Sequence, residues 1–272
     1  MKLHRKDIAY LFILLSLGLY IWTRNLRWLN SIDDAMPVLF ALPLFIHLGS
    51  PWTFRDHRDE VPALSVVGII FFGWVGLLMD STLLLTFVWV IALWAWLSVR
   101  LTSGSRIHAR RLMLLPILAF PWILLDASTL GWGFRYSGAY VAEGFYSLIG
   151  FHVVREGTLL NVQGLNLNVE AACSGLRMLQ ATLITGTAVA FVCLRDRKYY
   201  WWHLPVLLFF VWVANTTRII SIGAAALTFG VTFAEGAFHT WGGLLIICVM
   251  FGLCALMFSA AKNRIPPLPT SN

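Results

Sequence analysis

The 272-residue chain consists mainly of long apolar segments that are separated by shorter polar ones. Eight apolar segments approach the roughly 20 residues that a helix needs to cross about 30 Å of hydrocarbon. They lie at about residues 8–22, 36–48, 61–79, 81–99, 112–127, 173–194, 200–230 and 238–260. Because their apolar character is continuous from residue to residue, the pattern favours helices over a membrane β-barrel. We therefore predict an all-α polytopic membrane protein with about eight transmembrane helices.

The composition supports an integral membrane protein and excludes several other classes. Hydrophobic residues make up 59% of the chain and charged residues 12%, whereas a soluble domain has about 25% charged residues. The net charge of +7 does not indicate a nucleic-acid partner, because the basic residues form short clusters between apolar segments. Four scattered cysteines form neither a metal-binding spacing nor a disulfide framework. The first apolar segment lacks a small-residue cleavage site, so we expect it to be a retained span.

The distribution of Lys and Arg predicts the orientation in the membrane. If the N-terminus is cytoplasmic, fourteen of the 20 basic residues lie in cytoplasmic segments and four lie outside, while Arg177 and Arg218 fall within apolar segments. Such a bias toward the cytoplasm is typical of inner membrane proteins. We therefore place both termini in the cytoplasm of a multi-pass protein of the inner cell membrane.

The polar segment at residues 128–172 then lies on the extracytoplasmic side. Its first half is rich in aromatic residues, which is typical of a helix at the membrane interface. Its second half alternates apolar and polar residues around Glu156-Gly157 and Gln163-Gly164, which predicts short strands in a hairpin or a three-stranded flap. In chain order, the predicted parts are five N-terminal spans (1–127), the interfacial helix and flap (128–172), three further spans (173–260) and a cytoplasmic tail (261–272).

The sequence VEAACSGLRML, at the start of the sixth apolar segment, contains Glu170, Cys173 and Arg177 at intervals of three and four residues. The predicted topology leaves Cys173 as the only cysteine at the outer surface. The other three lie at the cytoplasmic end of the sixth segment or within the eighth, and we interpret them as small core residues, as free cysteines commonly are. Cys173 is therefore the candidate nucleophile.

The same topology selects one histidine and one arginine that can lie near Cys173. His239, at the start of the eighth segment, has the same predicted depth, whereas His152 in the flap can be an ordinary surface residue. Arg218 lies near the outer end of the seventh segment, three residues after Asn215, so the two side chains share one helix face. An arginine within a membrane span is costly and is expected to face the bundle interior with a partner.

These residue types have the chemistry of acyl transfer through a cysteine. A free thiol has a pKa of about 8.5 and attacks as the thiolate, which a neighbouring histidine and arginine favour. The arginine can also hydrogen-bond the oxyanion that forms on the attacked carbonyl, and the histidine can protonate the leaving amine. The N-terminus of the sixth helix, expected near Cys173, adds further stabilisation of negative charge.

Each of these residues also has a purely structural interpretation. Cys173, with the Ser and Gly that follow it, could simply allow close packing at a helix start. His239 could be an interfacial residue, and Arg218 could extend its guanidinium to the membrane surface.

Three further residues are expected to support the site. Glu170 and Arg177 could form a structural ion pair, shape the electric field around the thiol or hold an incoming substrate, and we expect support rather than chemistry from them. Asn215 is expected to satisfy the backbone or Arg218 by hydrogen bonding.

The motifs REGTLLNVQGLNLNVEAACSGLRML and NTTRI, followed by His239 and a Gly-Gly pair, resemble the exosortase/archaeosortase family. The resemblance extends over about residues 145–243. It depends on the pattern Glu-Ala-x-Cys-Ser-Gly-x-Arg, which is far more specific than an isolated Cys and His. It implies a single transmembrane domain over residues 1–272, with Cys173, Arg218 and His239 as the catalytic residues of a sortase-like cysteine transpeptidase.

The resemblance also implies the substrates and partners. The substrates would be exported proteins whose C-terminal tail combines a short motif such as Pro-Glu-Pro, a transmembrane helix and a basic cluster. The enzyme would cleave near the motif through an acyl-enzyme on Cys173 and transfer the protein to an acceptor in the cell envelope. Related bacterial systems accompany exopolysaccharide production. Membrane lipids are the other expected partner, and no metal, organic cofactor or nucleic acid is implied.

Two other functions are compatible with the same residues. An intramembrane cysteine peptidase that only hydrolyses would form the same acyl-enzyme on Cys173 and release the substrate to water. A transporter or assembly factor for a polysaccharide or lipid would instead use Arg218 and Glu170 to hold an anionic group, and would not need the thiol.

Overall fold

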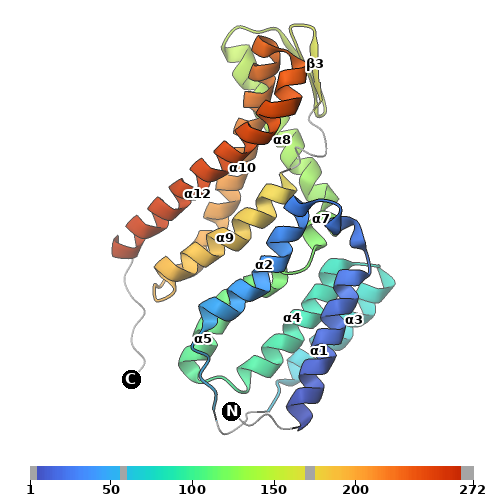
Figure 1. Ribbon diagram of the computed structural model, residues 1–272, viewed down its shortest axis with the longest axis vertical. Coiled ribbons are helices and arrows are strands. Elements are labelled where there is room, and N and C mark those ends of the chain that lie inside the picture. The colour runs from blue at the N-terminus through green and yellow to red at the C-terminus, as the bar shows by residue number, and fades with distance from the viewer. Residues whose placement is uncertain (1–4, 56–59, 169–174, 265–272) are drawn as a thin grey trace. The chain divides into compact units, whose positions relative to one another are not determined.

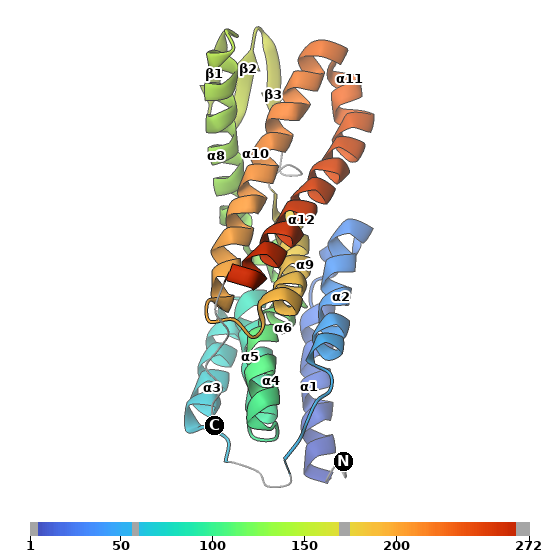
Figure 2. The ribbon, with the colours of Figure 1, turned by 90° about the vertical axis from the view of Figure 1, so that its left-hand side faces the viewer.

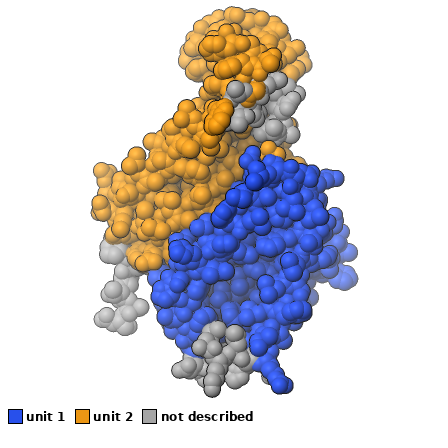
Figure 3. Space-filling view, viewed as in Figure 1, with its two compact units in different colours: residues 1–126 blue, residues 127–272 orange. Residues whose placement is uncertain are grey.

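The computed structural model describes residues 5–55, 60–168 and 175–264. Most of these residues are helical, and the second half of the chain also contains a small sheet (Figure 1). The chain divides into two compact units, Met1–Asp126 and Ala127–Asn272 (Figure 3).

Unit 1 contains α1 (Arg5–Thr23), the 3-10 helix η1 (Leu26–Leu29), α2 (Ile32–Gly49), α3 (Ala63–Leu78), α4 (Thr82–Ser98), α5 (Ser103–Leu112), α6 (Leu114–Leu118) and α7 (Trp122–Asp126). Helices α3 and α4 form a hairpin whose turn includes Asp80 at a φ of 53°. Ser81 caps α4 by accepting a hydrogen bond from the amide of Leu84 (3.3 Å). The indole of Trp89 in α4 donates to the carbonyl of Leu14 in α1 (2.7 Å). The largely buried α4 is thus the central helix of this unit.

The fifth predicted span, residues 112–127, is not one continuous helix, because the structure divides it into α6 and α7. Pro116 and Pro121 each lack an amide hydrogen, and the ring of each clashes with the carbonyl four residues earlier. Helix α5 therefore ends at Leu112, four residues before Pro116, and α6 ends at Leu118, three residues before Pro121. The carbonyl of Ile117, which Pro121 leaves without its helical donor, accepts a hydrogen bond from the indole of Trp122 (2.8 Å).

By length and composition, four described helices could cross a membrane: Ile32–Gly49, Leu176–Leu194, Tyr200–Phe229 and Trp241–Arg264. Three more apolar helices have 10–17 residues: Asp7–Thr23, Ala63–Leu78 and Thr82–Ser98. These seven helices coincide with seven of the eight predicted segments. They support an integral membrane protein, while the count of eight spans and the side on which the termini lie stay predictions.

Unit 2 contains α8 (Ser128–Leu148), β1 (Val153–Glu156), β2 (Leu159–Val162), β3 (Leu165–Asn168), α9 (Leu176–Leu194), the 3-10 helix η3 (Tyr200–Trp202), α10 (His203–Phe229), α11 (Val231–Phe233), the π-helical η4 (Ala234–Phe238) and α12 (His239–Arg264). Helix α10 packs against α8, α9 and α12. Figure 2 shows it between α8 and α12, with the sheet at one end. Helix α10 is therefore the common packing partner of the other long helices in this unit.

The three strands form an antiparallel sheet in the order β1-β2-β3, which confirms the three-stranded form of the predicted flap. The β2-β3 connection consists of Gln163 and Gly164, with positive φ values of 51° and 84°. Two positive φ values are characteristic of the type I′ turn, whose twist matches that of a hairpin. On the inner face of the sheet, Leu160 and Val162 are buried in one cluster with Tyr146 of α8.

Helix α8 connects this sheet to α10. The phenol of Tyr146 donates to the carbonyl of Ile220 in α10 (2.6 Å), and burial raises the pKa of Tyr146 to about 12, so the donor stays protonated. Gly223 of α10 makes room for the ring, because a Cβ there would lie 2.4 Å from the phenol oxygen. From β1, Arg155 donates to Oε2 of Glu143 in α8 (2.6 Å), and this hydrogen bond raises the pKa of Arg155.

Tyr146→Phe removes the hydrogen bond of a fully buried phenol and should lower the free energy of unfolding by about 1 kcal/mol. The measurement is the melting temperature of the purified chain in a mild detergent. Tyr140→Phe is the matched control on the same helix, because Tyr140 is 62% exposed. Its effect should stay within about 0.5 kcal/mol. Equal melting temperatures for the two variants would contradict this account of the contact between α8 and α10.

Candidate active site

One face of α10 contacts two segments: the residue just before α9, which follows the segment with Cys173, and the first turns of α12, which begins at His239. Asn215 and Arg218 are three residues apart on α10, so their side chains lie on the same face. A Cβ at Gly175, immediately before α9, would lie 3.0 Å from Cγ of Asn215. A Cβ at Gly243, in the second turn of α12, would lie 3.2 Å from Nε of Arg218. The entry to α9 and the first turns of α12 thus meet at α10.

Helix α9 begins later than the sequence predicts. The sequence predicts a helix start near Cys173, whereas α9 begins at Leu176. Gly175 precedes it with a φ of 75°, a left-handed conformation that glycine adopts without the steric cost of a Cβ. Cys173 and Glu170 lie outside the described residues. Gly175, the first described residue after them, leads into α9 and is buried against Asn215.

The amide of Asn215 is a polar group inside the bundle. The residue is 1% exposed, and within the part of the chain that the structure describes neither Oδ1 nor Nδ2 has a hydrogen-bond partner. Leaving such a group unpaired costs about 1–3 kcal/mol, so a buried amide is expensive unless it binds something. The hydroxyl of Thr216 is also buried and unpaired among these residues, but it faces α8, where a Cβ at Gly138 would lie 3.7 Å from Oγ1. Asn215 is the one of the two that faces the entry to α9.

Arg218 and His239 lie near the contact between α10 and α12. Arg218 is half-buried, and its guanidinium lies against the backbone at Gly243. His239 is the first residue of α12, four residues before Gly243, which is about one helical turn. The π-helical η4 that precedes it has a non-helical backbone at Gly236, with φ −89° and ψ −109°. Such π-helical turns frequently accompany functional sites, and this one determines where the helix with His239 begins.

The other predicted and considered residues have different surroundings. Arg177 is exposed on the first turn of α9, between the buried Leu176 and Met178. His152 is exposed in the loop before β1. Gln180, further along α9, is 1% exposed and was not among the predicted residues. A polar side chain within an apolar segment is the signal that could have identified it.

The described cysteines belong neither to the segment just before α9 nor to the first turns of α12. Cys193 is half-buried near the other end of α9, and its 17-residue separation from Leu176 corresponds to about 26 Å along the helix. Cys254 in α12 is buried, which confirms its interpretation as a core residue. That interpretation is wrong for Cys248, which is exposed on α12.

Gly175→Ala should destabilise the chain, because a Cβ would be strained at this φ and would press on the Asn215 side chain. We expect a loss of about 1–3 kcal/mol in the free energy of unfolding, measured as a lower melting temperature. Gly144→Ala is the control, because a Cβ at this position in α8 would meet no atom within 4 Å. That variant should be neutral or more stable by up to about 1 kcal/mol. A wild-type melting temperature for Gly175→Ala would contradict the placement of Gly175 against Asn215.

A comparison with known protein families shows a match to nearly the whole chain. The family described as transmembrane exosortase matches residues 3–259 of the 272. No match to the chain is found among curated proteins or among solved structures. The family match covers nearly all of both units and includes the entry to α9, the polar face of α10 and the start of α12. The chain therefore belongs to the transmembrane exosortase family.

Proposed function

We propose that the chain is a membrane cysteine protease and transpeptidase that cleaves the C-terminal sorting tail of exported proteins and transfers them to an acceptor in the cell envelope. Membership of the exosortase family supports a sorting role of this general kind. The observation on which the proposal most depends is that the entry to α9 and the first turns of α12 contact one polar face of α10. Cys173 is two residues before Gly175, and two peptide units span at most about 7 Å.

The first half of the proposed reaction forms an acyl-enzyme. The imidazole of His239 takes the proton of the Cys173 thiol, and the thiolate attacks the carbonyl carbon of the scissile peptide bond. The electron pair of the carbonyl moves to its oxygen, where the guanidinium of Arg218 and Nδ2 of Asn215 donate hydrogen bonds. The C–N bond then breaks, and His239 gives its proton to the departing amine. The tail helix leaves with a new amino terminus, and the protein remains as a thioester on Cys173.

The second half releases the protein. An acceptor nucleophile gives its proton to His239 and attacks the thioester carbonyl, with the same hydrogen bonds on the oxyanion. The C–S bond breaks, the protein is joined to the acceptor, and the thiol is restored with the proton from His239. Transfer and hydrolysis differ only in whether the nucleophile is an envelope molecule or water.

The proposed orientation has eight spans, both termini in the cytoplasm and the active site on the extracytoplasmic side of the inner membrane. Lys262 and Arg264 lie in the last turn of α12, and His239 lies in its first. The 26 residues of α12 correspond to about 39 Å, more than the hydrocarbon thickness, so the two ends fit opposite surfaces. An even number of spans requires one crossing besides the seven apolar helices, and the predicted fifth segment at residues 112–127, which contains α6 and α7, would supply it.

Co-expression with a tailed substrate tests the proposed chemistry. Cys173→Ala should abolish processing, and Arg218→Ala and His239→Ala should each slow it by about 10²–10³-fold, because oxyanion stabilisation and proton transfer are lost. Cys248→Ala is the matched control for loss of a thiol and should process normally. Normal cleavage by Cys173→Ala would contradict the proposal and favour a transporter or assembly factor. The mass of the mature C-terminus separates transfer from hydrolysis, since only transfer adds the mass of an acceptor.

Asn215→Leu separates function from stability at the polar face of α10. Leucine has nearly the shape of asparagine and removes a buried unpaired amide, so the melting temperature should be unchanged or higher. Processing should nevertheless fall by about tenfold or more, because an oxyanion donor is lost. Thr216→Val is the control that removes the neighbouring buried hydroxyl and should leave processing unchanged. Full activity of Asn215→Leu would show that the amide has no part in the reaction.

A further inference from the structure

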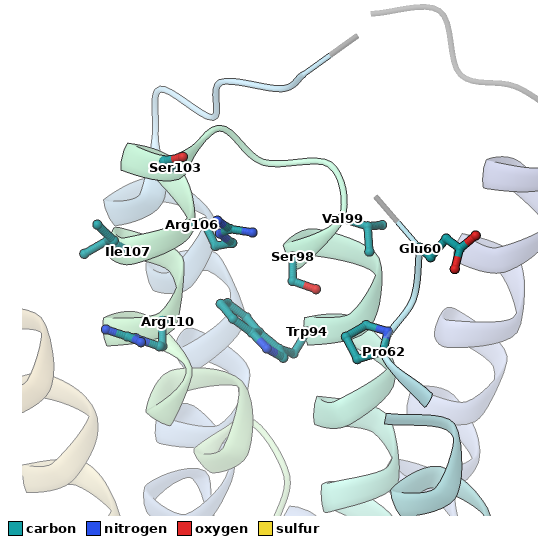
Figure 4. A pocket seen from close by; sticks show the side chains of 9 residues that line it. All are labelled: Glu60, Pro62, Trp94, Ser98, Val99, Ser103, Arg106, Ile107 and Arg110. Carbon is teal, nitrogen blue, oxygen red and sulfur yellow. The ribbon is translucent and has the colours of Figure 1, made fainter. Parts of the chain in front are cut away.

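Unit 1 contains a cavity of about 470 Å³ between α4, α5 and the segment that leads into α3. Its walls include the indole of Trp94, the ring of Pro62 and the side chain of Ile107, and its basic and hydroxyl groups come from α4 and α5 (Figure 4). The volume is in the range of small-molecule binding sites. None of its residues belongs to the site in unit 2.

The polar groups of the cavity favour an anion. Arg106 and Arg110 are four residues apart on α5, so both line the cavity from neighbouring turns. Figure 4 shows Arg106 extending from α5 toward Ser98 of α4, above the indole of Trp94. Ser103, the first residue of α5, adds a hydroxyl at the positive end of that helix. The acidic lining residue is Glu60, which is exposed, so the lining includes two guanidinium groups and one carboxylate.

Two arginines with hydroxyl groups nearby are well suited to a phosphate group. A guanidinium has five N–H donors, so each arginine can donate to a phosphate while it keeps another contact. Arginine also binds phosphate oxygens in pairs of parallel hydrogen bonds. The apolar walls formed by Trp94 and Ile107 would suit the carbon atoms that adjoin such a phosphate.

The surroundings of the cavity favour a lipid over a soluble phosphate. Two residues after Pro62, an apolar stripe begins on α3, with exposed side chains at Leu64 (82%), Val67 (60%), Phe71 (59%) and Trp74 (69%). The spacing of three and four residues places these side chains on one face of the helix. In a membrane protein, such a face adjoins acyl chains, and basic pockets beside spanning helices bind anionic headgroups.

We propose that this cavity binds an anionic phospholipid, with the phosphate held by Arg106 and Arg110 and the acyl chains along the exposed stripe of α3. The lipid would fix α5 to α3 and α4 at the membrane surface. This site is independent of the cysteine chemistry and does not require it.

Native mass spectrometry of the full chain in a neutral detergent tests the proposal with short-chain phosphatidylglycerol and phosphatidylcholine of equal chain length. We expect one phosphatidylglycerol to bind at least about tenfold more tightly than phosphatidylcholine, because only the former has a net negative headgroup. The double variant Arg106→Gln/Arg110→Gln should lose this preference. Ser98→Phe keeps both arginines but fills the cavity, and it should also lose the preference. Arg110→Gln alone, at an exposed position, provides a milder change if the double variant does not fold.

The matched control is Lys262→Gln/Arg264→Gln, which removes the same charge from exposed positions at the end of α12. It should keep the preference for phosphatidylglycerol. Equal loss in both double variants would show attraction to net charge alone and would overturn the cavity as the site. Displacement of the lipid by millimolar inorganic phosphate would overturn the lipid in favour of a soluble phosphate. Equal binding of the two lipids by the wild type would overturn the proposal entirely.

Discussion

Close approach of backbone to a polar helix face is the constraint on which the second unit depends. Asn215 and Arg218 lie within an apolar helix, where polar groups are costly unless they are paired or bind a ligand. Gly175 and Gly243 have no side chains, and this absence brings the entry to α9 and the first turns of α12 against these two residues. A larger residue at either glycine would move one segment away from the polar face. The proposed oxyanion donors would then lose their position relative to the thiol.

Further along α10, the same helix supports the sheet that precedes the cysteine. Tyr146 of α8 bonds the α10 backbone beside Gly223, and Leu167 of β3 packs against Ala225 and Ala226. The chain is therefore held against α10 just before and just after the segment that contains Cys173. A site whose flanks are fixed on one rigid helix can hold reacting groups in position more accurately than a free loop can.

The sequence predicts most of the helical segments and the strands because their patterns are long or strongly periodic. The prediction of one continuous helix is wrong at residues 112–127, where hydropathy alone indicates a span but Pro116 and Pro121 divide the helix. The sequence also places the start of α9 near Cys173, because a helix pattern cannot show the left-handed φ of Gly175. The closeness of Gly175 to Asn215, and of Gly243 to Arg218, depends on packing between helices that are far apart along the chain. No local pattern contains that information, although polar residues within apolar segments indicated where to look.

The most direct test of the central claim is to isolate the covalent intermediate. Purified chain is mixed with a tailed substrate, quenched in acid and examined by intact mass and peptide mapping. The proposed chemistry predicts an added mass equal to the substrate without its tail, attached at Cys173 and released by hydroxylamine as a thioester would be. The same chain with Cys173→Ala should show no adduct. Efficient cleavage of the substrate without any adduct at Cys173, or with an adduct at another residue, would contradict the account.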